Sequence, residues 1–204
     1  AAAITDQMTT AMQAQIAAMR PEIGKLMEVV YDNASVEDRL LDAGTLAPEL
    51  AREFGALGYV GRGASAAFDV RRDAPYPPYD RLTVDVPVFH YGDIAARLRV
   101  RAEEIVASFN LIEQLLATMP GGPFNVDWKT PDPDAEGFGI VEGWRGEIVT
   151  FVRFGTDGRI TRFFPRDPSW LTWPVLEKLI RNNIVPDFPV CNKSVNGSYS
   201  GHDL

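Results

Sequence analysis

The first thirty-one residues carry apolar side chains at spacings of three and four positions, the pattern of one helix face. The positions are Met8, Met12, Ile16, Met19, Ile23 and Met27. We expect this methionine-rich stripe to pack against the core rather than to contact a cofactor. Pro21 lies inside the pattern and predicts either a kink or the first turn of a second helix.

Two short helices and a long irregular segment are predicted next. Ser35 and Thr45 are good N-caps and predict helices over residues 36–43 and 46–54. Residues 55–87 hold glycines and prolines without a periodic apolar pattern, so we expect a long ordered loop. Because these glycines follow no predicted strand and lack the G-x-G-x-x-G spacing, the segment is not interpreted as a dinucleotide-binding loop.

The second half of the chain changes from a helical to a strand-like pattern. Residues 92–119 place apolar side chains along one seam of a helix of about seven turns. The proline-bearing segment 129–136 is predicted to be an exposed loop. Alternating apolar positions over 148–154 and 160–164, joined by a Thr-Asp-Gly turn, predict a β-hairpin.

A last helix is predicted over residues 172–182, with Thr172 as its cap and irregular structure after it. The elements together define an α+β chain that is mainly α-helical, with a small antiparallel hairpin or sheet. We expect a single domain over residues 1–204. Its parts are a helical part at 1–120, a β-hairpin part at 137–165, and a C-terminal helix and tail at 166–204.

Composition limits the classes of partner. The chain has 204 residues, with 20 basic and 28 acidic side chains and a formal net charge of −8. Because a phosphate backbone would be repelled by the chain as a whole, we expect no nucleic-acid partner. No apolar run approaches the roughly 20 residues that cross a bilayer, and a secretion signal is not recognisable, so we expect no direct membrane insertion.

Metal ligands and nucleophiles are scarce. The chain has one cysteine, Cys191, and two histidines, His90 and His202. We therefore expect a reducing compartment, no internal disulfide and no metal bound by this chain. The spacing supports no Ser-His-Asp, Cys-His or paired-carboxylate arrangement, so the catalytic residues stay unassigned.

Charged and aromatic residues gather between residues 62 and 93. They are Arg62, Asp69, Arg71, Arg72, Tyr76, Tyr79, Asp80, Asp85 and Asp93. Two interpretations remain open: a loop held in place by Arg–carboxylate pairs, or the wall of a pocket or docking surface. The run Trp144-Arg145-Gly146-Glu147 precedes the predicted hairpin, where Gly146 allows close backbone approach and Arg145 can point toward a cavity.

These residues also carry a family resemblance, which extends from about Met12 to Leu204. The matching runs are Arg20-Pro21-Glu22-Ile23, Gly61-Arg62-Gly63-Ala64-Ser65, Asp69-Val70-Arg71-Arg72, Pro75-Tyr76-Pro77-Pro78-Tyr79-Asp80, Asp85-Val86-Pro87-Val88, Gly92-Asp93, Arg97, Val100-Arg101, Glu104 and Trp144-Arg145-Gly146-Glu147. The chain resembles the large subunit that respiratory complex I, in its 49-kDa-type subunit, shares with membrane-bound nickel–iron hydrogenases. The resemblance implies the helical body of that subunit.

Two departures limit what the resemblance implies. Hydrogenases of this family hold nickel and iron with two cysteine pairs, and Ser198 and Gly201 stand where the C-terminal pair is expected. Serine and glycine do not supply two soft thiolates, so we expect no nickel–iron centre. The sheet region that begins the family subunit has no counterpart here. We therefore expect this chain to be the C-terminal portion of a longer large subunit and inactive by itself.

The function implied by the resemblance is that of a membrane-associated NADH:quinone oxidoreductase-like complex. Electrons would pass from an iron–sulfur cluster in a small partner subunit toward quinone, with membrane subunits as further partners. The implied location is the cytoplasm, peripheral on the cytoplasmic face of the inner membrane. Two alternatives stay open: a structural or docking subunit without redox chemistry, and a true nickel–iron subunit of a formate-hydrogenlyase-like complex.

The resemblance and the composition of the chain together nominate residues that line a pocket or redox site. These candidates are Arg62, Asp69, Arg71, Tyr76, Asp80, Arg145, Glu147, Ser198, His202 and Asp203. We further hypothesise that Arg145 and Arg62 converge with Asp69, Asp80 or Asp203 on the remnant of the metal pocket.

Overall fold

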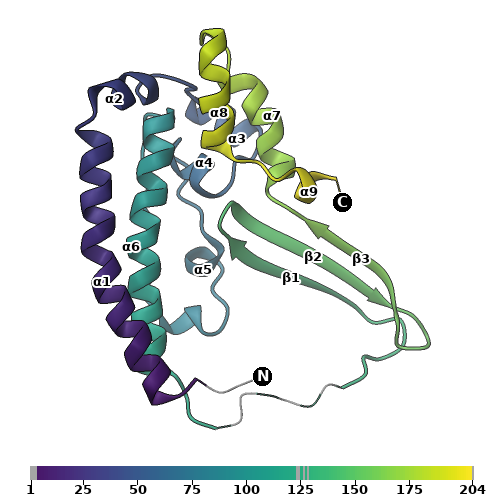
Figure 1. Cartoon of the computed structure of the whole chain (residues 1–204). Coiled ribbons are helices and arrows are strands. Elements are labelled where there is room, and N and C mark those ends of the chain that lie inside the picture. The colour runs from purple at the N-terminus through teal and green to yellow at the C-terminus, as the bar shows by residue number, and fades with distance from the viewer. Residues whose placement is uncertain (1–3, 123–124, 126, 128, 204) are drawn as a thin grey trace.

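Two long antiparallel helices form one side of the molecule (Figure 1). The computed structural model describes residues 4–122, 125, 127 and 129–203. Helix α1 (Asp6–Tyr31) continues through Pro21 without a second start, and Thr5 caps it by accepting a hydrogen bond from the Met8 amide. Helix α6 (Ile94–Thr118) begins at Asp93, whose carboxylate accepts from the Ala96 amide at 2.7 Å.

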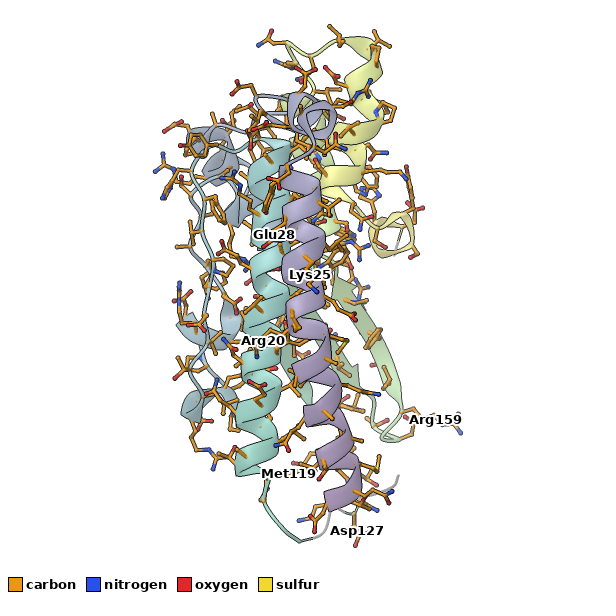
Figure 2. All side chains as sticks on the ribbon, turned by 60° about the vertical axis from the view of Figure 1, so that its left-hand side comes forward. Arg20, Lys25, Glu28, Met119, Asp127 and Arg159 are labelled. Atoms are coloured by element: carbon orange, nitrogen blue, oxygen red, sulfur yellow. The ribbon has the colours of Figure 1, made fainter. Side chains whose placement is uncertain are left out.

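The methionine-rich stripe of α1 is only partly covered. Ile16 is buried and Met12 is half-buried against α6, but Met8 and Met19 remain 47% and 41% exposed. These side chains stay exposed because α1 lies on the outside of the molecule and packs along α6, as Figure 2 shows. Arg20 links the two helices through Glu113 at 3.0 Å.

The two short helices after α1 form where they were expected, but with other caps. Helix α2 (Ala34–Leu40) is capped by the side chain of Asn33, so Ser35 lies inside its first turn. Helix α3 (Pro48–Glu53) starts at a proline and has no side-chain cap. The Thr45 hydroxyl instead donates to the Asp42 carbonyl, which closes the turn before α3.

The predicted long loop contains three short helical segments. They are α4 (Gly58–Arg62), α5 (Val70–Asp73) and the 3-10 turn η1 (Tyr79–Arg81). Each is too short to show a helical apolar period. Gly58 has φ +54°, and a Cβ there would overlap the backbone of Arg145, so this glycine lets α4 lie directly on the turn between the first two strands.

The sheet has three antiparallel strands in the order β1–β2–β3. Strands β2 (Gly146–Phe154) and β3 (Ile160–Arg166) are the predicted hairpin. The added strand β1 (Glu136–Gly143) pairs with β2 from Glu136–Arg153 to Gly143–Gly146, so the β part is a sheet rather than a hairpin alone. In Figure 1 the β1–β2 turn points toward α4 and α5, and the other end of the sheet extends away from the helices.

The C-terminal part is more helical than predicted. Helix α7 (Ser169–Leu179) begins before Thr172, which is therefore an interior residue and not a cap. Segments η2 (Val185–Asp187), α8 (Phe188–Val195) and α9 (Tyr199–His202) follow where irregular structure was expected. The prolines of η2 and α8 stand in the first turn of each segment, where a missing amide costs no hydrogen bond.

The hydrophobic core lies where α3, α4, α7, α8 and the first half of α6 meet. Its most completely buried side chains include Leu46, Tyr59, Val100, Val175, Leu179 and Val195. Arg97 is also fully buried and donates to the Gly92 and Gly44 carbonyls and to the Ser194 hydroxyl. The prediction of a mainly helical α+β fold with a small antiparallel sheet is confirmed.

Candidate functional site

Arg62 is the centre of a buried group of charges. It ends helix α4 and is 1% exposed, because the α4 backbone is enclosed by the core. Its Nη1 donates to Glu142 Oε1 at 3.2 Å and to the Phe68 carbonyl at 3.1 Å. Its Nη2 lies 2.5 Å from Glu104 Oε1. One guanidinium therefore joins α4 to α6 and to the end of β1.

Asp69 is the third carboxylate beside Arg62, with Oδ2 at 3.4 Å from Nη1. It also caps α5 by accepting from the Arg71 amide, and it is 1% exposed. Arg71 binds it with two parallel hydrogen bonds, from Nε at 3.0 Å and from Nη2 at 2.8 Å. This fork-to-fork pair is the strongest ion-pair geometry that an arginine makes.

Glu104 and Glu142 lie in a poorly solvated environment. Burial raises the pKa of each carboxyl, and the nearby Arg62 guanidinium opposes that rise. Glu142 also accepts a hydrogen bond from the Val70 amide at 3.1 Å, which favours its charged form. We call Arg62, Asp69, Arg71, Glu104 and Glu142 the Arg62 cluster.

A cavity of about 350 Å³ opens beside the Arg62 cluster. Apart from cluster members, its wall includes Arg101, Ser108 and Trp144. Arg101 lies over the Tyr59 ring at 4.9 Å, and Tyr59 packs on Trp144 with ring centroids 5.3 Å apart. The wall thus combines charged groups with aromatic surface, as polar ligand sites do.

The nominated residues from the irregular segment divide into two groups. Arg62, Asp69 and Arg71 are joined in the Arg62 cluster. Tyr76 is half-buried nearby and packs edge-on against Tyr79, with ring centroids 5.1 Å apart. Asp80 is exposed, and its nearest cation is Arg81 at 3.8 Å.

Arg145 faces a different part of the molecule. Its Nε donates to the Asn196 carbonyl at 2.6 Å, and its guanidinium lies over the Trp144 ring at 5.0 Å. The ion pairs formed by the described residues include none from Arg145. The hypothesised convergence of Arg145 with Arg62 on one carboxylate is therefore not the observed arrangement. Glu147 pairs with Arg166 across the sheet at 2.7 Å.

The C-terminal candidates form local contacts around α9. Ser198 caps α9 by accepting from the Gly201 amide at 3.0 Å. A Cβ at Gly201 would lie 2.6 Å from Asp167 Cγ, so the Asp167 carboxyl fills the space that a cysteine at 201 would need. His202 and Asp203 pair with each other at 3.3 Å on the surface. These residues do not fit the thiolate pair of a nickel–iron site.

Three important residues were absent from the nominated set. Glu104 lies one helical turn after Arg101 on α6, and that spacing was a usable signal. Glu142 follows a glycine-rich stretch in β1, and no strand was predicted there. Tyr59 carries no signal of its own, but its hydroxyl donates to the Val195 carbonyl at 2.5 Å and ties α4 to α8.

The fold is similar to that of a chain in a respiratory membrane complex. The structure of the membrane-bound sulfane sulfur reductase, described as an archaeal respiratory membrane complex, contains a chain that matches with a TM-score of 0.88. The match has 27% sequence identity and covers 98% of this chain and 56% of that chain. None of the helices in the described part of the chain is long and apolar enough to cross a membrane.

The family described as "Respiratory-chain NADH dehydrogenase, 49 Kd subunit" matches residues 1–133, and the chain belongs to this family. A subunit of the NADH-quinone oxidoreductase of Desulfotalea psychrophila is 32% identical over 90% of this chain and 50% of its own length. Formate hydrogenlyase subunit 5 of Escherichia coli is 32% identical over 91% of this chain and 32% of its own length. The chain thus spans a third to a half of these two relatives, and the predicted resemblance is confirmed.

Proposed function

We propose that this chain is the C-terminal portion of the large subunit of a complex-I-like oxidoreductase, in which electrons pass from a partner iron–sulfur subunit to quinone without a nickel–iron centre. The family membership supports a respiratory complex. The single observation that carries the choice within the family is the position of the Asp167 side chain, because a Cβ at Gly201 would lie 2.6 Å from Asp167 Cγ and a cysteine there would force Asp167 to move.

In this proposal the Arg62 cluster gives the large subunit a rigid polar wall. Arg62 holds α4, α6 and β1 together, and Arg71 fixes Asp69. The cavity beside them supplies charged donors and an aromatic surface that suit the carbonyl oxygens and ring of a quinone. Arg145 anchors the C-terminal segment at Asn196 and positions Trp144 at the cavity.

The partners proposed for the parent protein are a small iron–sulfur subunit and membrane subunits. The proposed location is the cytoplasmic face of the inner membrane, reached through those subunits. Residues 1–204 would act as one domain of the parent, since the core joins α4 to α8 through Tyr59 and Val195.

A docking role without redox chemistry is a second candidate. Large apolar side chains on the sheet favour it, with Phe138 75% exposed and Phe163 59% exposed. Such side chains are typical of a surface that a partner covers.

A hydrogenase role is the third candidate, since relatives at 31–32% identity include the carbon monoxide-induced hydrogenase of Rhodospirillum rubrum and formate hydrogenlyase subunit 5.

The three candidates separate in one experiment on the parent complex, purified intact. Elemental analysis would measure nickel, and parallel assays would follow quinone reduction and hydrogen uptake. We expect quinone reduction without stoichiometric nickel. Nickel together with hydrogen uptake would establish the hydrogenase role instead, and an intact complex with neither activity would leave the docking role.

A photoreactive quinone analogue tests the proposed pocket more directly. We expect labelling of peptides that line the cavity, around Arg101 and Trp144, and competition by excess quinone. Labelling confined to other subunits would refute a quinone pocket in this chain.

A further inference from the structure

The Arg62 cluster contains more acid than base. Three carboxylates, from Asp69, Glu104 and Glu142, meet two guanidiniums, from Arg62 and Arg71. Arg71 uses Nε and Nη2 on Asp69. Among the described residues, Glu104 and Glu142 form ion pairs with Arg62, one with each of its terminal nitrogens, and Arg71 acts on both from farther away.

The cluster also contains unpartnered polar atoms. Arg62 Nε has no hydrogen-bond partner among the described residues, although the side chain is almost completely buried. Arg62, Glu104 and Glu142 all line the 350 Å³ cavity. A polar cavity of this size has room for several water molecules, and buried polar atoms without protein partners are the usual sites of ordered water.

We propose that Glu104 and Glu142, both paired with the Arg62 guanidinium at the cavity wall, form a site that binds one exchangeable proton on either carboxyl and exchanges it with water in the cavity. Two carboxylates that share one cation in a buried site resist ionising together. The proton resides on one carboxyl oxygen and moves to cavity water when the site is emptied. No bond other than O–H forms or breaks.

The surrounding groups support a single shared proton. Asp69 contributes a further negative charge beside the pair, and the pKa of both glutamates is raised mainly by burial. Arg101 lines the same cavity, with its guanidinium over the Tyr59 ring. Tyr76 and Tyr79 lie on the α5 side, and burial raises the pKa of Tyr76, so it stays neutral where a glutamate titrates. This inference does not depend on the proposed quinone chemistry.

Infrared difference spectroscopy of the parent complex during a pH titration tests the site, with glutamate carboxyls labelled with carbon-13. We expect a protonated-carboxyl band that titrates above the ordinary glutamate range. Glu104→Gln and Glu142→Gln should each remove it, because either change leaves two carboxylates beside two guanidiniums and no excess negative charge to hold a proton. Glu113→Gln is the matched control, since Glu113 lies on the same helix but is exposed and paired with Arg20.

Two results would overturn the proposal: no such band in the wild-type complex, or a band that survives both glutamine variants. If a glutamine variant fails to assemble, Glu142→Asp keeps the carboxyl and should shift the titration midpoint without removing the band. An unshifted midpoint would contradict the site. The quinone assay can fail independently, because the proton band is read without turnover.

Discussion

The Arg62 cluster and the α9 end of the chain are two polar regions of opposite character. Around Arg62, five charged side chains from α4, α5, α6 and β1 are linked by ion pairs, with Arg62 and Asp69 buried and the other three partly buried. Around Ser198 and Gly201, the contacts are a serine cap and backbone hydrogen bonds, at a surface end. The first region is built from ion pairs, whereas the second is built around a serine hydroxyl and backbone groups.

This difference indicates how much a substitution should cost in each region. Buried charges are costly to separate, because removal of one partner leaves the others uncompensated in a poorly solvated site. A neutral cap at a partly exposed helix end can change one residue at a time. We therefore expect the Arg62 cluster to tolerate substitution poorly and the α9 end to tolerate it better.

The largest expected effect comes from Arg62→Ala in the full-length parent subunit. The change leaves Asp69, Glu104 and Glu142 without their shared cation, and we expect a loss of about 3–5 kcal/mol of unfolding free energy. Chemical denaturation followed by circular dichroism measures it. Arg52→Ala is the control, because its pair with Glu49 is exposed and worth about 0.2–1 kcal/mol at most. Equal losses in both variants would contradict the cluster's role.

The second expected effect tests the α9 end through Gly201→Cys. The new side chain meets Asp167 and should destabilise the chain by about 1–3 kcal/mol through overpacking. Adding Asp167→Ala should restore part of that loss, which a double-mutant cycle in thermal unfolding would measure. Strictly additive effects would show that Asp167 does not occupy this space.

Arg145→Ala should have a smaller effect than Arg62→Ala. It removes one hydrogen bond to the Asn196 carbonyl and the contact with Trp144, and strands no carboxylate. We expect a loss of about 1–2 kcal/mol in chemical denaturation. Arg145→Lys, which keeps the charge but lacks Nε, should lose nearly as much. A loss as large as that of Arg62→Ala would mean that Arg145 has a buried anionic partner after all.

The long elements were predictable from the sequence because their signals are repeated. Helix α6 lies within the predicted 92–119 because its apolar seam recurs over many turns and Asp93 caps it. Strand β1 was missed because its glycines and its mostly exposed side chains hide the period of two. Helix α8 was missed because its first-turn proline was interpreted as a break, and α9 was missed because it is four residues long and lies in a polar tail.

The site was predictable only in part, for a similar reason. Arg62, Asp69 and Arg71 lie close in sequence, and their pairing was one of the two open interpretations. Glu142 is 80 residues from Arg62 and comes from the missed strand, so no local pattern could place it there. Arg145 was predicted to face a cavity, but the close packing of α4 on the β1–β2 turn directs it toward α8 instead.

The smallest expected effect is on how stability depends on pH, and it compares the two regions directly. Burial raises the folded-state pKa of Glu104 and Glu142, so the folded state holds a proton longer than the unfolded chain. Their contribution to stability is therefore fully present below the ordinary glutamate pKa and is lost as the pH rises through the raised value. Glu104→Gln should flatten this decline in thermal unfolding midpoints. Asp203→Asn, at the α9 end, should leave the decline unchanged, because its exposed carboxyl pairs with His202 and with no other of the described residues. If Asp203→Asn flattened the decline and Glu104→Gln did not, the pH dependence would come from the α9 end and not from the Arg62 cluster.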